Sequence, residues 1–319
     1  MANRALRLQW LKRVAVESAS GGRVRDWASL RLAYRDAAAT RRAATTRGVS
    51  TLDTRDSQSL MGETRPETLF ILGSGPSVNT LSAQNLDEVG RGFSIGVNSW
   101  ILHPFVPNVY AFEPSESVEY HHESQVLREV LATRLEQGHD SRILHLRPHA
   151  STDKALEVLP PDALAHRFSY YGRTALTTQL VSNLERDLTQ LLQAHSGERL
   201  PSEILLDSGG SVGRMVSLGI FFGFQKIVLT GVDLNRNEYF FEDNPGYLED
   251  LGITSYNPWK SRTKHHETQQ RTNRAFVATE FLGALAKLSK ERGGPEMFVA
   301  NHQSLLSEVM PPYEWSGRN

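Results

Sequence analysis

The sequence predicts an α/β fold: a single Rossmann-like, mostly parallel sheet with helices on both faces and a lid, preceded by an N-terminal helical segment. Three observations lead to this prediction. From Thr68 onward, short apolar runs alternate with amphipathic helical patterns, which is typical of a parallel sheet covered on both sides. One glycine-rich turn follows the first expected strand, and a second runs directly into an apolar helical stretch. Hydrophobic residues make up 39% of the chain, which is enough to fill a core.

Residues 1–50 differ from the rest of the chain in charge. They hold eleven Lys or Arg against three acidic residues, although the whole chain has a net charge of -1. Apolar residues recur in them at helical spacing, so we expect a basic amphipathic helical segment. Two interpretations stay open: the helices dock on the main domain or on a second copy in a homo-oligomer, or they lie on an anionic membrane surface. Residues 51–67 follow as an expected linker.

Residues 68–319 form the expected nucleotide-binding domain. Two helices are indicated by leucines at helical spacing, one from Leu176 to Leu191 and one from Phe281 to Leu288. Residues 235–266 are polar and aromatic and interrupt the alternation, which favours a functional lid. The expected buried strands are Thr68–Leu72, Phe93–Val97, Val109–Phe112, Ile143–Leu146, Ile227–Leu229 and Met297–Val299.

The first expected strand leads into a glycine turn. Its two glycines allow a sharp bend that can bring backbone N–H groups close to an anion. The turn lacks the third glycine of the dinucleotide fingerprint and the Gly-Lys-Ser/Thr of a P-loop, so neither motif is assigned. A plain tight turn is the alternative. The residues are Gly73, Ser74, Gly75, Pro76 and Ser77.

A second glycine turn runs directly into an apolar helical stretch. Hydroxyl groups and exposed amides at a helix start form a cradle for an anion. The strand Ile227–Leu229 is followed closely by Asp233, which places a carboxylate at the same edge of the sheet. The residues of this second turn are Ser208, Gly209, Gly210 and Ser211.

Two further polar residues follow expected strands. Asn98 comes directly after Phe93–Val97, and Glu113 comes directly after Val109–Phe112. Ligands of open parallel sheets bind at the carboxyl ends of strands, so this amide and this carboxylate are candidates for contacts with a nucleotide or a sugar. The alternative is that Asn98 satisfies turn backbone and Glu113 caps a helix.

The end of the expected lid carries His265 and His266. A histidine there suits a general base, because its ordinary pKa of about 6.5 permits proton removal near neutrality. A solvated helix start is the alternative. The chain has no Asp-x-Asp and no His-Glu-x-x-His, so no metal site is expected.

Taken in order, these stretches resemble the small bacterial sialyltransferases that use CMP-activated sugars. That family runs through Gly-Asn-Gly-Pro-Ser, Asn, Asn-Pro-Ser, Ser-Gly before an apolar helix, Gly-Ile-Asp, lid tyrosines, a catalytic His and a closing Asn-Ser-Leu-Leu. The resemblance spans about residues 68–310. The matching stretches here are Gly73–Ser77, Asn98, Glu113–Ser115, Ser208–Ser211, Gly223–Asp233, Tyr239, His265–His266 and Asn301–Leu306.

The resemblance implies inverting, metal-independent sugar transfer from a CMP donor to a glycan or glycolipid of the cell surface, with no cofactor. His266 or His265 would deprotonate the acceptor, and Tyr239 would hydrogen-bond the departing phosphate. Asn235 stands in the place of one lid tyrosine, and Glu113 stands where the family has an asparagine. The donor therefore stays open between sialic acid, Kdo and a related acidic sugar.

Two other functions stay open. Gly209-Gly210 and Gly231–Leu234 also resemble the pterin diphosphokinases, which would imply ATP, magnesium, and Asp233 or Glu113 near the metal. The second of these functions is a non-catalytic scaffold that keeps the nucleotide fold. The near-zero net charge indicates no nucleic-acid partner, and the absence of cysteine suits a cytoplasmic protein, with peripheral contact at the inner membrane if residues 1–50 bind lipid.

Overall fold

The structure is a computed structural model. It describes residues 23–63, 66–113, 121–146, 167–176, 178, 180–207, 210–254, 256, 266–269 and 276–317. Residues 1–22 of the expected N-terminal segment lie outside this part of the chain, as do Ser208, Gly209 and His265.

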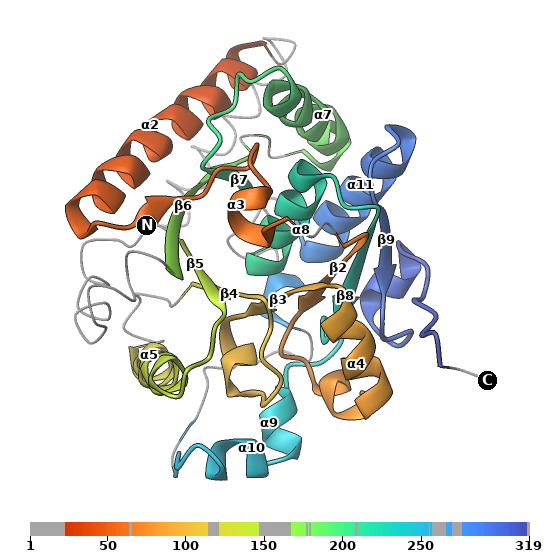
Figure 1. The fold of residues 1–319 in the computed structure, drawn as a ribbon. Helices are drawn as coiled ribbons and strands as arrows, with labels where there is room; N and C mark the ends of the chain where they lie inside the picture. Colours follow the sequence, from red (N-terminus) through yellow and green to blue (C-terminus); the bar gives the residue numbers. More distant parts are fainter. Residues whose placement is uncertain are drawn as a thin grey trace, which may run out of the picture.

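A nine-stranded sheet forms the centre of the molecule (Figure 1). Its strand order is β1-β6-β5-β4-β3-β2-β8-β9, with β7 paired to β6, and all of these pairs are parallel. This confirms the predicted α/β class. The strands are β1 (Ser50–Thr51), β2 (Thr68–Leu72), β3 (Phe93–Val97), β4 (Val109–Phe112), β5 (Arg142–Leu146), β6 (Phe168–Ala175), β7 (Ile204–Asp207), β8 (Lys226–Thr230) and β9 (Glu296–Val299).

Helices cover both faces of the sheet. None of them, within the part of the chain that the structure describes, is long and apolar enough to cross a membrane. The α-helices are α2 (Arg23–Arg47), α3 (Gln58–Met61), α4 (Ala83–Arg91), α5 (His121–Glu136), α7 (Leu184–Ser196), α8 (Ser211–Phe222), α9 (Phe240–Asp243), α10 (Gly246–Glu249) and α11 (Ala278–Glu291). Short 3₁₀ helices are η1 (Pro76–Thr80), η2 (Asn98–Leu102), η5 (Val181–Asn183), η6 (Glu267–Gln269) and η7 (Leu305–Glu308).

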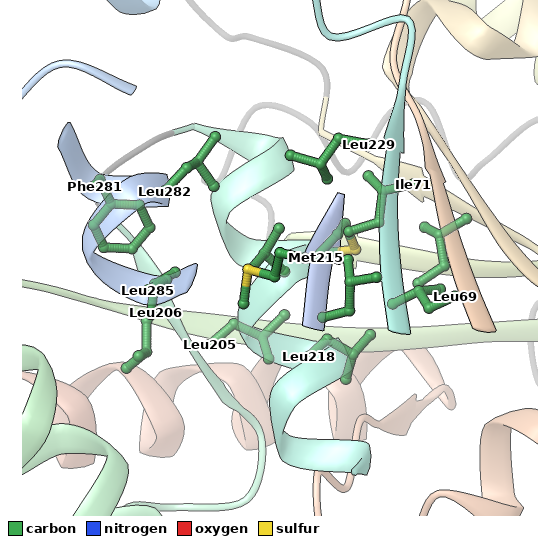
Figure 2. Close-up of a cluster of buried hydrophobic side chains, with 14 of the residues drawn as sticks. Leu69, Ile71, Leu205, Leu206, Met215, Leu218, Leu229, Phe281, Leu282 and Leu285 are labelled. Atoms are coloured by element: carbon green, nitrogen blue, oxygen red, sulfur yellow. The ribbon is translucent and has the colours of Figure 1, made fainter. Parts of the chain in front are cut away.

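Alternate residues of the central strands serve two separate cores, because successive side chains of a strand point to opposite faces. Leu69 and Ile71 of β2 pack with α8 and α11 on one face, where Met215 and Phe281 also lie (Figure 2). Phe70 of β2 belongs to the other core, with Trp100, Phe240 and Trp315. A strand buried on both faces reads as a continuous apolar run, which is why these strands could be located from sequence.

One predicted helix begins later than its leucine spacing suggested. The expected helix started at Leu176, whereas α7 begins at Leu184. Leu176 directly follows β6, and Leu180 precedes the short turn η5. The spacing was therefore wrong over its first two turns, because Leu176 enters the core directly after β6 and Leu180 has an extended backbone.

Helix α2 packs along β6. Small residues make this close approach possible: Ala33 and Ala37 are fully buried, and a Cβ on Gly172 of β6 would lie 2.6 Å from Asp36 Oδ2. Asp36 accepts the backbone N–H of Arg173 at 2.8 Å. Within residues 23–47, then, the basic segment has one face docked on the sheet.

Within the expected linker 51–67, the described residues contribute to the folded domain. Thr51 lies in β1, whose partner in the sheet is β6. Leu52 and Leu60 are buried in the core. The Ser, Thr and Asp content that indicated a linker instead forms turns, such as the one in which Asp53 Oδ1 accepts the N–H of Arg55.

Candidate functional site

The glycine turn after β2 is held against the loop after β8. Gly73 N–H donates to Thr230 O, and Gly75 N–H donates to Gly231 O, both at 2.7 Å. A Cβ at Gly73 would lie 2.6 Å from Gly231 O, so this approach of two backbones requires glycine.

This arrangement differs from the anion cradle that we expected at Gly73–Ser77. The N–H of Ser77 donates to Asp233 Oδ2 at 2.9 Å, and Pro76 has no N–H group. Three of the expected donors are therefore already committed to the β8 loop. The turn joins two strand ends, and Ser74 supplies the remaining N–H of the five residues.

Asp233 lies at the centre of this junction and is 4% exposed. Besides Ser77, its carboxylate accepts the side-chain N–H of Asn301 at 2.7 Å. The same stretch is tied again by Ser304, whose hydroxyl donates to Val232 O at 2.6 Å. The Gly231–Asp233 and Asn301–Leu306 stretches, matched separately to the family pattern, thus meet in space.

A second cluster joins three of the predicted donor-binding residues. Asn98 Oδ1 accepts the backbone N–H of Glu113 at 2.9 Å, and Asn98 Nδ2 donates to Ser211 Oγ at 3.2 Å. Ser211 Oγ in turn donates to the Glu113 carboxylate. Asn98 reaches this position with φ at 46°, in the left-handed region that asparagine tolerates better than most residues.

The Glu113 carboxylate is also paired with Arg214, on the first turns of α8. Arg214 Nε donates to Glu113 Oε1 at 2.8 Å, and its Nη2 donates to Glu113 Oε2. The two side chains are 4% and 6% exposed. Tyr171 of β6 donates a further hydrogen bond to Glu113. The charge of the Glu113 carboxylate is therefore balanced by Arg214 within the protein.

Asp207, the last residue of β7, extends the network. It accepts from Arg214 Nη1 on one oxygen and from Arg173 at 2.8 Å on the other. Burial alone would lower the pKa of Arg214, but the charges and hydrogen bonds of Glu113 and Asp207 outweigh burial and raise it. Arg214 is held as a permanent cation between two carboxylates.

Arg214, Asp207 and Tyr171 were not identified from the sequence. A signal for Arg214 was present: it is the single charged residue in the twelve residues of α8, SVGRMVSLGIFF. A lone charge in an apolar helix indicates a buried ion pair, because an unpaired buried charge is too costly.

Short helices of the predicted lid cover η1 and η2. Phe240 packs on Trp100, with ring centroids 6.1 Å apart, and its N–H donates to Ser74 O at 3.0 Å. Tyr239 stacks on Phe241 at 5.3 Å, and its N–H donates to Glu242 Oε2 at 2.7 Å. These contacts hold the Tyr239 backbone close to the first glycine turn.

The last predicted residues lie where the lid leaves and rejoins the domain. Asn235 Nδ2 donates to Gln303 O at 3.0 Å. His266 returns the chain to the same point, since its N–H donates to Leu234 O at 3.2 Å. His266 Nδ1 lies 2.9 Å from Thr268 Oγ1. The backbone N–H of Thr268 also donates to His266 Nδ1 at 3.3 Å, so Nδ1 is the acceptor nitrogen of the ring.

No protein-family model matches the chain, and no curated protein sequence matches it. Among solved structures, the MAf glycosyltransferase from Magnetospirillum magneticum AMB-1 is similar at 14% identity and a TM-score of 0.45, over 89% of this chain. The chain spans 39% of the length of that protein. The sialyltransferase CST-II in complex with trisaccharide acceptor and CMP is similar at 13% identity and a TM-score of 0.42, over 79% of this chain and 88% of that one. The same values hold for CstII from Campylobacter jejuni in complex with CMP-3FNeuAc.

Proposed function

We propose that this protein is an inverting, metal-independent glycosyltransferase that moves an acidic sugar, such as sialic acid or Kdo, from a CMP donor to a surface-glycan acceptor. One observation carries the proposal. Asn98, Glu113 and Ser211, chosen separately from three stretches of sequence, form one hydrogen-bonded cluster at the carboxyl edge of a parallel sheet. That edge is where open α/β sheets bind their ligands.

The start of α8 is the proposed site of the donor phosphate. The helix has Gly210 at its N-cap, and among the described residues no side-chain cap hydrogen bond is made there. The first N–H groups of a helix and the helix dipole favour an anion. Ser211 and Asn98 lie at this helix start and would orient the phosphate and its neighbouring sugar.

Glu113 is compatible with an anionic donor because its charge is already balanced. An unpaired carboxylate beside a phosphate would repel it. Here Arg214 shares two hydrogen bonds with Glu113, and Arg173 balances Asp207. The four side chains together carry no net charge, so the glutamate acts as an acceptor that fixes the Ser211 and Tyr171 hydroxyls.

The proposed reaction needs a base for the acceptor hydroxyl and a hydrogen-bond donor for the departing CMP. The acceptor hydroxyl oxygen attacks the anomeric carbon as the bond from that carbon to the CMP phosphate oxygen breaks, and the imidazole of His266 takes the hydroxyl proton. CMP leaves with the bonding electrons, and Tyr239 donates a hydrogen bond to its phosphate. Loss of one such preorganised donor typically costs about 2.7–4 kcal/mol of transition-state stabilisation.

The compartment and partners belong to the same proposal. A glycolipid acceptor would bring the protein to the inner face of the membrane, where the basic residues 1–50 would contact anionic lipid. Contact of this segment with a second copy of the chain is the competing proposal. Helix α2 keeps Arg31, Arg35 and Arg42 on its exposed side, which supports either partner.

Calorimetric titration with CMP and with ATP, each with and without magnesium, tests the proposal. We expect CMP to bind equally well with and without magnesium. Magnesium-dependent binding of ATP without binding of CMP would instead support the diphosphokinase. Failure of both nucleotides to bind would support the non-catalytic scaffold.

Replacing the proposed base gives a sharper test. His266→Ala should lower transfer by about 10²–10⁴-fold, the usual contribution of a general base, while the Kd for CMP stays unchanged. His122→Ala, on the exposed side of α5, is the matched control and should leave turnover unaltered. Unchanged turnover of His266→Ala would remove this residue from the mechanism.

A further inference from the structure

A polar cavity of about 250 Å³ opens beside η1. It lies between η1, the end of β8 and the segment after β9, and Trp315 closes one side. Hydroxyl and amide side chains predominate in its lining, among them Ser77, Gln84 and Asn301. Of the described residues that line it, none is Asp, Glu, Lys or Arg. The described lining therefore presents no permanently charged side chain to a ligand.

Thr230 gives the cavity an unsatisfied hydrogen-bonding group. The residue is 1% exposed, and its Oγ1 is buried without a hydrogen-bond partner among the described residues. Thr230 is two positions after Val228 in β8, so its side chain is on the same face of the sheet, the one that Trp315 also covers. Buried hydroxyls are normally paired, and an exception calls for a partner such as a ligand or an ordered water.

The cavity is distinct from the cluster around Glu113. Helix α8, which carries Ser211 and Arg214, packs with Ile71 and Leu229 on the other face of the sheet. The crossing of Gly75 and Gly231 lies at the sheet edge between the two faces. Neither the proposed base nor the proposed phosphate site uses Thr230.

We propose that this cavity binds a neutral, hydroxyl-rich ring, with Thr230 Oγ1 hydrogen-bonding to a ring hydroxyl. Uncharged hydroxyl and amide groups both donate and accept, as sugar hydroxyls do. The volume lies below the roughly 300–1,000 Å³ of pockets for drug-sized ligands, so it suits a single ring and not a whole nucleotide sugar. Two sources share this chemistry: a sugar of the acceptor glycan and the ribose of the donor. That choice of sources rests on the proposed function.

The experiment titrates the full chain with methyl β-galactoside and methyl N-acetylglucosaminide for the acceptor source, cytidine for the donor source, and inorganic phosphate as a charged probe. Ligand-observed NMR measures each Kd. We expect saturable binding of a glycoside or of cytidine, and Thr230→Val should weaken it about tenfold through loss of one hydrogen bond. Thr230→Val should not lower Tm, because the hydroxyl that it removes has no protein partner.

Thr174→Val is the matched control. Thr174 is also a strand threonine with 1% exposure, but its hydroxyl donates to Ser29 O at 3.1 Å. This variant should lower Tm and leave ring binding unchanged. Absence of binding by every neutral ring, equal binding by Thr230→Val, or a loss confined to phosphate would overturn the proposal.

The outcomes separate this proposal from the transfer reaction. Failure of CMP to bind, together with Thr230-dependent binding of a glycoside, would overturn the proposed function and keep the sugar cavity. If CMP binds equally well to the wild type and to Thr230→Val, and no neutral ring binds, the proposed function stands and the sugar cavity is overturned.

Discussion

Two buried carboxylates at the same edge of the sheet are stabilised in different ways. Asp233 accepts hydrogen bonds from two neutral donors, the N–H of Ser77 and the side chain of Asn301. Glu113 accepts from the guanidinium of Arg214 and from the hydroxyls of Ser211 and Tyr171. One acid is balanced by dipoles and the other by an ion pair.

The difference separates two tasks. Asp233 holds loops together, because its two partners, the backbone N–H of Ser77 and the side chain of Asn301, lie on the chain segments that it joins. Glu113 binds side chains and holds functional groups, so its partners come from β6 and α8. A buried ion pair is seldom a net gain in stability over apolar packing, whereas breaking it leaves a costly charge. The Glu113 region should therefore be the more sensitive of the two to loss of one partner.

Loss of Arg214 should have the largest effect. Arg214→Met keeps the length of the side chain but leaves Glu113 buried without a cation, so we expect the free energy of unfolding to fall by about 3–5 kcal/mol. Urea denaturation measures this change. The double variant with Glu113→Gln should recover part of the loss, because the uncompensated charge is removed.

Arg236→Met is the matched control. Arg236 lies 3.2 Å from Glu238, and the two side chains are 51% and 43% exposed, so its loss should cost less than about 1 kcal/mol. Equal effects of the two arginine variants would mean that the Glu113 pair is no more important than a surface pair.

Asp233→Asn should have a smaller effect. An amide presents one acceptor and one donor group, so either Ser77 N–H or Asn301 Nδ2 would face another donor. We expect a loss of about 1.5–3 kcal/mol in urea denaturation, the range for hydrogen bonds to a charged group. Asp87→Asn, on the exposed side of α4, should change stability by less than about 0.5 kcal/mol. A loss as large as that of Arg214→Met would erase the contrast between the two clusters.

Asn98→Gly should have the smallest effect on folding. Glycine gives up both hydrogen bonds of Asn98 but adopts its φ of 46° freely, so the net change should stay within about 1 kcal/mol. Asn98→Ala loses the same bonds without that relief, and we expect it to be less stable by about 1 kcal/mol more. Both should bind CMP more weakly in calorimetry. Full CMP affinity in Asn98→Gly would restrict this side chain to shaping the turn.

The central strands could be located from sequence because they are buried on both faces. Strand β6 could not, since its sequence FSYYGRTA mixes polar and apolar residues where α2 approaches it. The signal for that contact is divided between Gly172 and the alanines of α2, which are far apart in the chain.

Individual residues at the site could be anticipated from their place after strands, as with Asn98 and Glu113. Their partners could not. The pairing of Glu113 with Arg214 depends on where α8 begins relative to β4, which is a long-range packing outcome. N–H groups of the Gly73–Ser77 turn donate to the β8 loop because that loop approaches them. No local sequence pattern specifies this approach.

The backbone crossing of Gly73 and Gly75 with Gly231 has a mechanical consequence. With hydrogen bonds of 2.7 Å in both places and no room for a side chain between them, the two loops must move as one rigid body or lose both bonds. The chain leaves this body through Leu234, whose carbonyl holds His266 at the root of the lid. A shift of the first turn would thus be transmitted to the start and the end of the lid together.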